Sequence, residues 1–160
     1  MAIIIGNGGH ARALAHRYFP GENVRMLGPN EEIPIEGDLI IGMGDVKTRR
    51  VIFRLLESRI AYNQQIMAGV LIGPHVHLGK NILINTGAQI DHDCVIGDHC
   101  SIAPGAILCG GVTLGEGCFI GAGAIIVENV TLEPNTFIPA GSLVVKQDDI
   151  RMPQRVVQNG

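Results

Sequence analysis

Large aromatic side chains are scarce in this sequence, which limits the kind of core it can build. Of the 160 residues, 4% are aromatic and none is tryptophan, whereas glycine occurs 22 times. Hydrophobic residues still make up 46% of the chain, so there is enough apolar material for folding. A core that relies on Ile, Leu, Val and Gly is typical of thin, regularly stacked layers and not of a bulky globular interior.

Strong net charge and long apolar runs are also missing. The formal net charge is -3 at pH 7, and the pair Arg49–Arg50 is too isolated to form a nucleic-acid-binding patch. No stretch approaches the roughly 18 apolar residues that a membrane-spanning helix needs. The opening MAIIIG has no basic start and is too short for a signal peptide. We therefore expect a cytoplasmic protein that binds neither nucleic acid nor membranes.

None of the four cysteines belongs to a recognisable metal motif. Cys94, Cys100, Cys109 and Cys118 form no CxxC pair, and their spacings match no zinc signature. All but Cys109 fall on a position that recurs every six residues and is usually small, where a thiol acts as a compact apolar filler. Cys109 lies at a corner, and its role stays open. The sequence therefore predicts no metal site.

The N-terminal region shows the mixed pattern of a small α/β domain. Short buried-strand runs at 2–5, 24–27 and 38–44 alternate with helical patterns at 11–19 and 45–60. Such alternation predicts a parallel sheet, and we expect a truncated, Rossmann-like domain over residues 1–58. One face of the second helix is expected to carry Val46, Arg50, Ile52, Leu55 and Leu56.

From Ile66 onward the sequence repeats every six residues. An aliphatic residue occupies fourteen consecutive repeat positions, namely Ile66, Ile72, Leu78, Ile84, Ile90, Ile96, Ile102, Leu108, Leu114, Ile120, Ile126, Leu132, Ile138 and Val144. A period of six fits neither an amphipathic helix nor an alternating strand, and it is typical of a β-helix with stacked coils. The sequence predicts an all-β parallel β-helix over residues 59–160, ending in a short C-terminal tail.

An acid–base cluster interrupts this repeat at Asp91, His92 and Asp93. In the six-residue register Ile90 points inward, so His92 follows at a corner and is expected to project outward. Because the ordinary pKa of histidine is near 6.5, an outward imidazole beside carboxylates can accept and release protons at neutral pH. The same position also suits a solvated corner histidine, and spacing alone leaves both interpretations open.

Three stretches of the chain carry a more specific pattern: IIIGNGGHARAL, INTGAQIDHDCVIGD and GGVTLGEGCFIGAGAIIVENV. Together they resemble the left-handed β-helix acyltransferases of the sialic acid O-acetyltransferase and bacillosamine-type sugar N-acetyltransferase family. The resemblance covers nearly the whole chain. It implies a left-handed parallel β-helix, acetyl-CoA as the acetyl donor, no metal, and a homotrimer with acetyl-CoA between neighbouring β-helices.

The resemblance also implies catalytic roles. His92 matches the general base that deprotonates the acceptor, and Asp93 matches the carboxylate that supports it. The backbone N–H of Gly110 matches the donor that stabilises the thioester oxygen, a contribution typically of roughly 3 kcal/mol. A glycine at this position also fits a roomy corner without any function, so this assignment depends on the resemblance.

Further residues match positions that bind the two substrates in this family. On the nucleotide-sugar side they are Gly8, Gly9, His10, Gly44, Asp45 and Asn85. On the acetyl-CoA side they are Ser101, Gly110, Ala122 and Ala140. The GNGGH loop precedes a helix, whose free N–H groups favour a diphosphate, although an ordinary strand-to-helix turn would have the same sequence.

The chain departs from the family pattern at several places. Gly28-Pro29-Asn30 stands where the family has an acidic pair that reads the nucleotide base. Ser101 replaces a histidine that contacts the acetyl group, so Ser101 itself or the nearby His99 would have to supply that contact. Ala140 stands where relatives often have glycine, and the C-terminal MPQRVV resembles the usual VPAK ending only loosely.

The predicted function is acetyl transfer from acetyl-CoA to the amine of a nucleotide-linked amino-deoxy sugar, for example of the UDP-4-amino-4,6-dideoxy-N-acetylglucosamine type. The main alternative is O-acetylation of a sialic acid or related sugar. The sequence is also compatible with a non-catalytic scaffold, or with a metal-dependent hydratase that uses His75, His77, His92 and His99.

Overall fold

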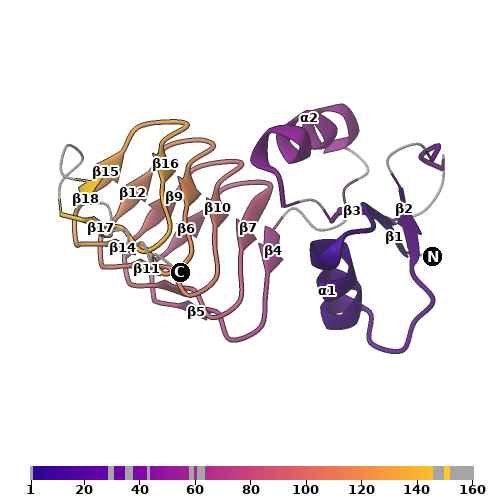
Figure 1. Ribbon diagram of the computed structural model, residues 1–160, viewed down its shortest axis with the longest axis horizontal. Helices are drawn as coiled ribbons and strands as arrows, with labels where there is room; N and C mark the ends of the chain where they lie inside the picture. Colours follow the sequence, from indigo (N-terminus) through magenta and orange to yellow (C-terminus); the bar gives the residue numbers. More distant parts are fainter. Residues whose placement is uncertain are drawn as a thin grey trace, which may run out of the picture.

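The computed structural model describes residues 2–28, 31–34, 38–42, 44–57, 60, 64–145 and 150–151. Figure 1 shows two parts, a small α/β unit at the N-terminus and a stack of triangular coils that begins at β4. The predicted boundary at residues 58 and 59 lies outside the described residues, as do Pro29, Asn30 and the C-terminal MPQRVV. No helix in the described ranges is both long and apolar enough to cross a membrane.

The N-terminal unit is a three-stranded parallel sheet with two helices. The strand order is β2 (Arg25–Leu27), β1 (Ala2–Ile5), β3 (Asp38–Ile41), and the helices are α1 (Gly9–Tyr18) and α2 (Val46–Leu56). The predicted parallel α/β arrangement is therefore confirmed. A complete Rossmann half has two crossover helices, whereas the described residues between β2 and β3 contain none, so the finer description is not supported.

The buried face of α2 differs from the predicted one. Arg49 and Phe53 are buried, whereas Leu55 is 76% exposed. The reason is that this face of α2 packs against residues 99 and 100 of the β-helix. The Phe53 and His99 rings meet edge-on with their centroids 5.6 Å apart. Arg49 Nη2 donates to the carbonyl oxygens of His99 and Cys100 at 3.2 and 3.0 Å. An arginine was not expected in the interior, and its burial lowers its pKa to about 10.

The repeat region forms three parallel ladders of short strands. Ladder 1 consists of β4 (Gln64–Ile66), β7 (Ile82–Ile84), β10 (Ser101–Ile102), β13 (Phe119–Ile120) and β16 (Phe137–Ile138). Ladder 2 consists of β5 (Leu71–Ile72), β8 (Gln89–Ile90), β11 (Ile107–Leu108), β14 (Ile125–Ile126), β17 (Leu143–Val144) and an antiparallel β18 (Ile150–Arg151). Ladder 3 consists of β6 (His77–Leu78), β9 (Val95–Ile96), β12 (Thr113–Leu114) and β15 (Thr131–Leu132).

The aliphatic repeat positions line the interior, as predicted. From Ile84 to Val144 every one of them is at most 2% exposed, and Cys94, Cys100 and Cys118 are fully buried beside them. Ile72, in the first coil, is 40% exposed because that coil has a neighbour on one side only. The six-residue repeat and the parallel ladders fit the predicted left-handed β-helix.

Equivalent residues recur every 18 positions, so each corner of the coil is itself a stack. We call the turns between ladders 1 and 2 corner 1–2, which includes residues 85–88, and those between ladders 2 and 3 corner 2–3, which includes residues 91–94. In corner 2–3, Gly111 N–H donates to the His92 carbonyl and Asn129 N–H donates to the Gly110 carbonyl, at 2.9 and 3.0 Å. These bonds fix the order His92, Gly110, Glu128 along the stack.

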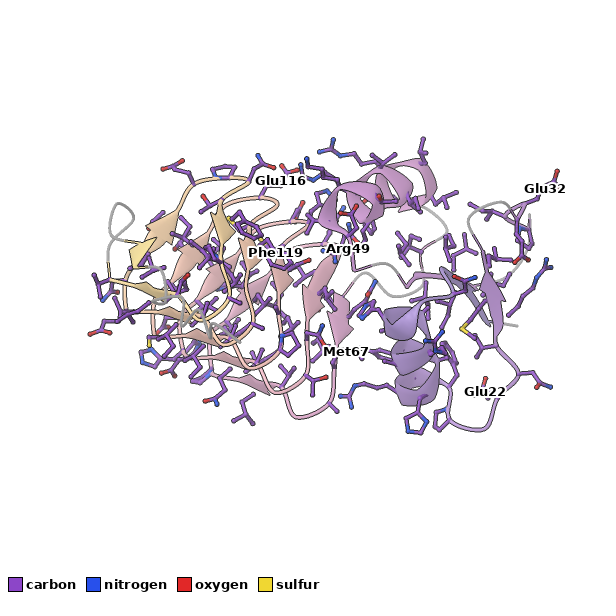
Figure 2. The ribbon with its side chains drawn as sticks, in the orientation of Figure 1. Glu22, Glu32, Arg49, Met67, Glu116 and Phe119 are labelled. Carbon is purple, nitrogen blue, oxygen red and sulfur yellow. The ribbon has the colours of Figure 1, made fainter. Side chains whose placement is uncertain are left out.

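The two parts of the chain share an apolar junction. Met67 and Leu83 of the β-helix pack with Ile4, Leu14 and Ile40 of the α/β unit. Figure 2 shows Met67 on the side of the coils that faces this unit, and Arg49, from α2, between the helix and the coils. Burial of the outward-facing side chains of Gln65, Leu83 and Ser101 shows that the N-terminal half of ladder 1 is covered.

Candidate active site

His92 projects from corner 2–3, as the six-residue register predicted. Its side chain is 55% exposed and that of the neighbouring Asp93 is 60% exposed. Asp93 has a φ of 59°, a left-handed conformation that an acidic residue tolerates better than most and that sharpens the corner. His92 Nδ1 lies 2.7 Å from Asp93 Oδ2. The imidazole is therefore outside the apolar core and held by a carboxylate.

This contact decides which nitrogen of His92 is free to react. The Asp93 carboxylate can only accept, so Nδ1 carries the proton and Nε2 has the lone pair in the neutral ring. The hydrogen bond with Asp93 raises the pKa of His92, and the negative charge of Asp91 raises it further. The ring is thus a stronger base than an ordinary histidine, with Nε2 as its basic atom.

Gly110 lies directly under the imidazole, one coil along the stack. A Cβ atom at this position would lie 2.7 Å from His92 Cε1 and 2.8 Å from Nε2, too close for any side chain unless the ring moves. Gly110 does not have the positive φ of its neighbour Gly111, so its backbone would accept alanine. Among the described residues no group accepts a hydrogen bond from its N–H. The absence of a side chain at Gly110 therefore makes room for the His92 ring, and the Gly110 N–H remains available as a hydrogen-bond donor beside it.

A depression of about 550 Å³ contains this arrangement. It is lined by Asp91, His92, Asp93, Cys109, Gly110, Gly111, Glu128 and Asn129. Three of these residues carry carboxylates and none is Lys or Arg, so His92 is the only side chain among them that can become cationic. We call this depression the His92 pocket.

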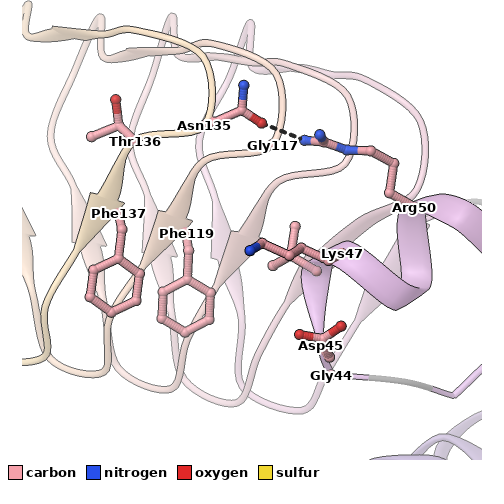
Figure 3. A pocket seen from close by; sticks show the side chains of 10 residues that line it. Gly44, Asp45, Lys47, Arg50, Gly117, Phe119, Asn135, Thr136 and Phe137 are labelled. Atoms are coloured by element: carbon pink, nitrogen blue, oxygen red, sulfur yellow. Dashed lines mark hydrogen bonds between the residues drawn. The ribbon is translucent and has the colours of Figure 1, made fainter.

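A second depression, of about 440 Å³, lies where the start of α2 faces ladder 1. Figure 3 shows Gly44 and Asp45 on one side and two phenylalanine rings, Phe119 and Phe137, on the other, with Lys47 between them. The rings are stacked, with centroids 5.2 Å apart and planes 11° from parallel. Gly44 and Asp45 were predicted, whereas Lys47, Phe119 and Phe137 were missed. The available signal was the pair of phenylalanines 18 residues apart, in a chain with only four.

The two predicted loops of the α/β unit both lie at helix starts. Asp45 caps α2 by accepting a hydrogen bond from Thr48 N–H at 2.7 Å, and its bonds to Thr48 lower its pKa. Gly8 and Gly9 are exposed at the start of α1. His10 Nε2 donates to Gln65 Oε1 at 2.9 Å, and burial lowers its pKa. His10 therefore links the α/β unit to the first strand of ladder 1.

Ser101 and His99 do not occupy an accessible position in the single chain. Ser101 is 2% exposed on ladder 1, and its hydroxyl has no partner among the described residues. His99 is 6% exposed, and its Nδ1 lies 2.8 Å from Asn81 Nδ2. The predicted contact of either residue with an acetyl group has no support in this arrangement, because α2 packs against this segment and covers it.

The remaining predicted residues lie at corner 1–2. Asn85 is half-buried, and its Oδ1 accepts the N–H of Thr86 at 2.8 Å. Ala122 and Ala140 are exposed in later coils of the same corner. The structure thus brings His92, Asp93 and Gly110 together, but it places Asn85, Ala122 and Ala140 at a different corner of the same triangle.

No three His, Cys, Asp or Glu side chains within the described ranges are grouped so that they could hold a metal ion. A hydratase would require such a group among His75, His77, His92 and His99. That function gains no support from the part of the chain that the structure describes.

Comparison with known proteins agrees with this geometry. Residues 75–110 and 111–146 match the family described as bacterial transferase hexapeptide (six repeats). No curated protein sequence matches the chain. Solved structures do: a histidine-to-alanine variant of GDP-perosamine N-acetyl transferase from Caulobacter crescentus, in complex with CoA and GDP-perosamine, is 25% identical over 95% of this chain and 97% of its own, with a TM-score of 0.79.

Two further structures extend the comparison. PerB from Caulobacter crescentus, in complex with CoA and GDP-perosamine, is 29% identical over 91% of this chain and 88% of its own, with a TM-score of 0.73. The acetyltransferase domain of PglB from Neisseria gonorrhoeae FA1090 shares the fold at 20% identity, with 95% and 98% coverage and a TM-score of 0.75. Taken with the His92 pocket, these matches show that residues 75–146 carry the hexapeptide repeat of bacterial transferases and that the chain is an acyltransferase.

Proposed function

We propose that the chain is an acetyl-CoA-dependent N-acetyltransferase that acts on the amine of a nucleoside-diphosphate-linked amino-deoxy sugar. The observation that carries this proposal is the His92–Asp93 pair above the open backbone of Gly110. A base with a free Nε2, a pocket beside it and an unused N–H donor are what acyl transfer to an amine requires. The relatives in complex with CoA and GDP-perosamine support the choice of donor and acceptor class.

In this mechanism His92 Nε2 removes a proton from the acceptor as its nitrogen attacks the thioester carbonyl carbon. Asp93 holds the ring through Nδ1 and stabilises the imidazolium that forms. The Gly110 N–H donates to the carbonyl oxygen as negative charge develops on it. When the C–S bond breaks, His92 returns its proton to the departing thiolate, which leaves as the thiol of CoA.

The nucleotide end of the acceptor is assigned to the α/β unit. The exposed loop Gly8–Gly9 opens α1 without a side-chain cap, so the free N–H groups there favour a diphosphate. Gly44 and Asp45 open α2, where Asp45 already accepts the Thr48 N–H, and we propose that this loop lies beside the nucleotide. His10 fixes the position of the first loop through Gln65. We propose that Asn85 contacts the sugar and that Ala122 and Ala140 line the path of the pantetheine arm.

A homotrimer would bring the catalytic base of one chain close to the proposed substrate contacts of a neighbouring chain. The base lies at corner 2–3, whereas the other proposed contacts lie at corner 1–2 and in the α/β unit, so neighbouring chains related by symmetry can complete one another's sites. Apolar side chains exposed on ladder 2, among them Leu71, Ile125 and Leu143, supply surface for such contacts. Light scattering at assay concentration measures the mass directly, and a monomeric mass for an active enzyme would contradict the trimer.

The pH dependence of activity gives a direct test of the His92–Asp93 pair. Because Asp93 raises the pKa of His92, the base becomes neutral only above an ordinary histidine's pKa, and kcat/KM should rise with pH through that higher value. Asp93→Asn removes the carboxylate and should move this limb to lower pH while reducing the rate. An unchanged limb in the variant would show that another group titrates.

The function itself is tested by thiol release from acetyl-CoA with a panel of acceptors. The panel contains UDP-, GDP- and dTDP-linked 4-amino-4,6-dideoxy sugars, their 4-hydroxy counterparts and a free sialic acid. We expect acetylation of at least one amino sugar nucleotide, with the product identified as an amide by mass spectrometry. Transfer only to hydroxyl acceptors would identify an O-acetyltransferase, and no transfer to any acceptor would refute the proposal.

A further inference from the structure

The far wall of the His92 pocket carries a carboxylate that the mechanism above does not use. Glu128 lies two coils beyond His92 in the corner 2–3 stack, and Gly110 lies between them. Neighbouring strands are about 4.8 Å apart, so the backbone atoms of residues 92 and 128 are separated by about 10 Å. Because Gly110 has no side chain, the His92 ring lies over its backbone, and the remaining space toward residue 128 belongs to the His92 pocket.

The gap that remains lies between the His92 ring and residue 128. His92 leans along the stack, since its Cε1 and Nε2 atoms are the ones that a Cβ at Gly110 would meet. The basic Nε2 therefore borders the gap on one side, and Glu128 lines the pocket on the other. A group bound in this gap lies between a base and a residue that carries a carboxylate.

The charge of the pocket favours a cation in that place. Asp91, Asp93 and Glu128 carry negative charge, and Asp93 is already bonded to His92. Glu128 has no hydrogen-bond or ion-pair partner among the described residues, so its carboxylate is free to bind a ligand. Its negative charge also reaches the floor of the pocket, because it contributes, after burial, to a raised pKa of the Cys109 thiol.

We propose that Glu128 is a positioning residue for the acceptor: its carboxylate binds the ammonium group of the amino sugar between residue 128 and the His92 ring, next to Nε2, and so selects amine over hydroxyl acceptors. This inference rests on the proposed function and adds the choice of acceptor to it. The bound ammonium releases one proton to bulk water past the exposed carboxylate. The amine nitrogen forms its bond to the carbonyl carbon, His92 takes a second proton, and the thiolate leaves with that proton.

The test compares Glu128→Gln with the wild-type chain, using the best amino sugar nucleotide of the panel and acetyl-CoA. We expect KM for the amine to rise about tenfold in the variant, with kcat unchanged or higher, because an attraction to the ammonium is lost. The matching hydroxy sugar nucleotide, measured as a competitive inhibitor, should bind both proteins within about a factor of two, since it carries no charge to lose. Added salt should raise KM in the wild type more than in the variant.

Two further variants separate positioning from general charge effects. Glu133→Gln makes the same charge change at an exposed position outside the His92 pocket, and it should leave KM for the amine unchanged. Glu128→Asp keeps the carboxylate and should recover part of the lost affinity. Equal KM values for Glu128→Gln, Glu133→Gln and the wild type would overturn the inference while leaving the proposed function intact. A wild-type chain that acetylates no amino sugar would overturn both.

Discussion

Replacing His92 with alanine is expected to lower kcat for acetyl transfer by about 10²- to 10⁴-fold, the usual contribution of a positioned general base. The physical reason is that the attacking nitrogen must lose a proton before the amide can form. Among the described side chains of the His92 pocket, no other is a nitrogen base that could take this proton. The side chain is 55% exposed and lies outside the core, so thermal unfolding should change little. Thiol release under saturating acetyl-CoA measures the loss.

A matched control is available on the same β-helix. His77 is an exposed histidine on ladder 3, outside the His92 pocket, so His77→Ala removes an equal side chain without touching the proposed chemistry. Full activity of His77→Ala beside an inactive His92→Ala would assign the loss to position 92. An active His92→Ala enzyme would refute the role of the base, whatever the state of the control.

Gly110→Ala is the second large effect that we expect. Its new methyl group would lie 2.7 Å from His92 Cε1, so the ring must rotate away from the space above the Gly110 backbone. A displacement of about 1 Å at a reacting group can cost about 10²-fold in rate, and we expect kcat to fall by about that factor. The backbone N–H is unchanged in alanine, so the variant tests the space that glycine leaves and not the hydrogen-bond donor.

The loss of activity in Gly110→Ala should not result from a less stable fold. The φ of Gly110 is not positive, and the clashing atoms belong to an exposed side chain that can move. Replacing glycine with alanine under these conditions stabilises a fold by about 0.4–1 kcal/mol by restricting the unfolded chain, so the melting temperature should be equal or slightly higher. A variant that unfolds well below the wild type would contradict this account.

A double-mutant cycle identifies the cause. If alanine at 110 acts by displacing the imidazole, it should have almost no further effect on the residual rate once His92 is already alanine. If it acts by blocking the substrate, the two losses should multiply. If the free-energy losses of the two substitutions add, displacement of the His92 ring is refuted as the cause of the loss in Gly110→Ala.

The sequence was informative where structure depends on a short repeat. Six residues are enough to decide which side chain of each strand points inward, so the buried aliphatic row from Ile84 to Val144 and the outward direction of His92 could be predicted without knowing any contact. The Asp93 partner could also be predicted, since it is adjacent in the chain. The predicted strand Ala2–Ile5 was confirmed for a similar reason, because a short buried run before a glycine turn can form few structures besides a strand.

Other features depended on contacts between distant segments. The face of α2 was predicted from its apolar residues, yet Arg49 is buried because the carbonyl oxygens of His99 and Cys100 accept its hydrogen bonds. Packing of α2 against the same segment covers Ser101, which the sequence placed in a cofactor site. The pocket formed by Lys47 with Phe119 and Phe137 exists only because α2 lies against ladder 1.

By itself the sequence therefore determined a coiled β architecture and the outward pairing of His92 with Asp93, because both follow from the local repeat and from neighbouring residues. Tertiary structure decided how groups from other coils face that corner: Gly110, which the resemblance had assigned to the site, lies beneath the imidazole, and Glu128 lies beyond it. These residues are 18 and 36 positions away from His92. The physical reason is that the ladder hydrogen bonds between coils, and not proximity along the chain, bring them into one pocket.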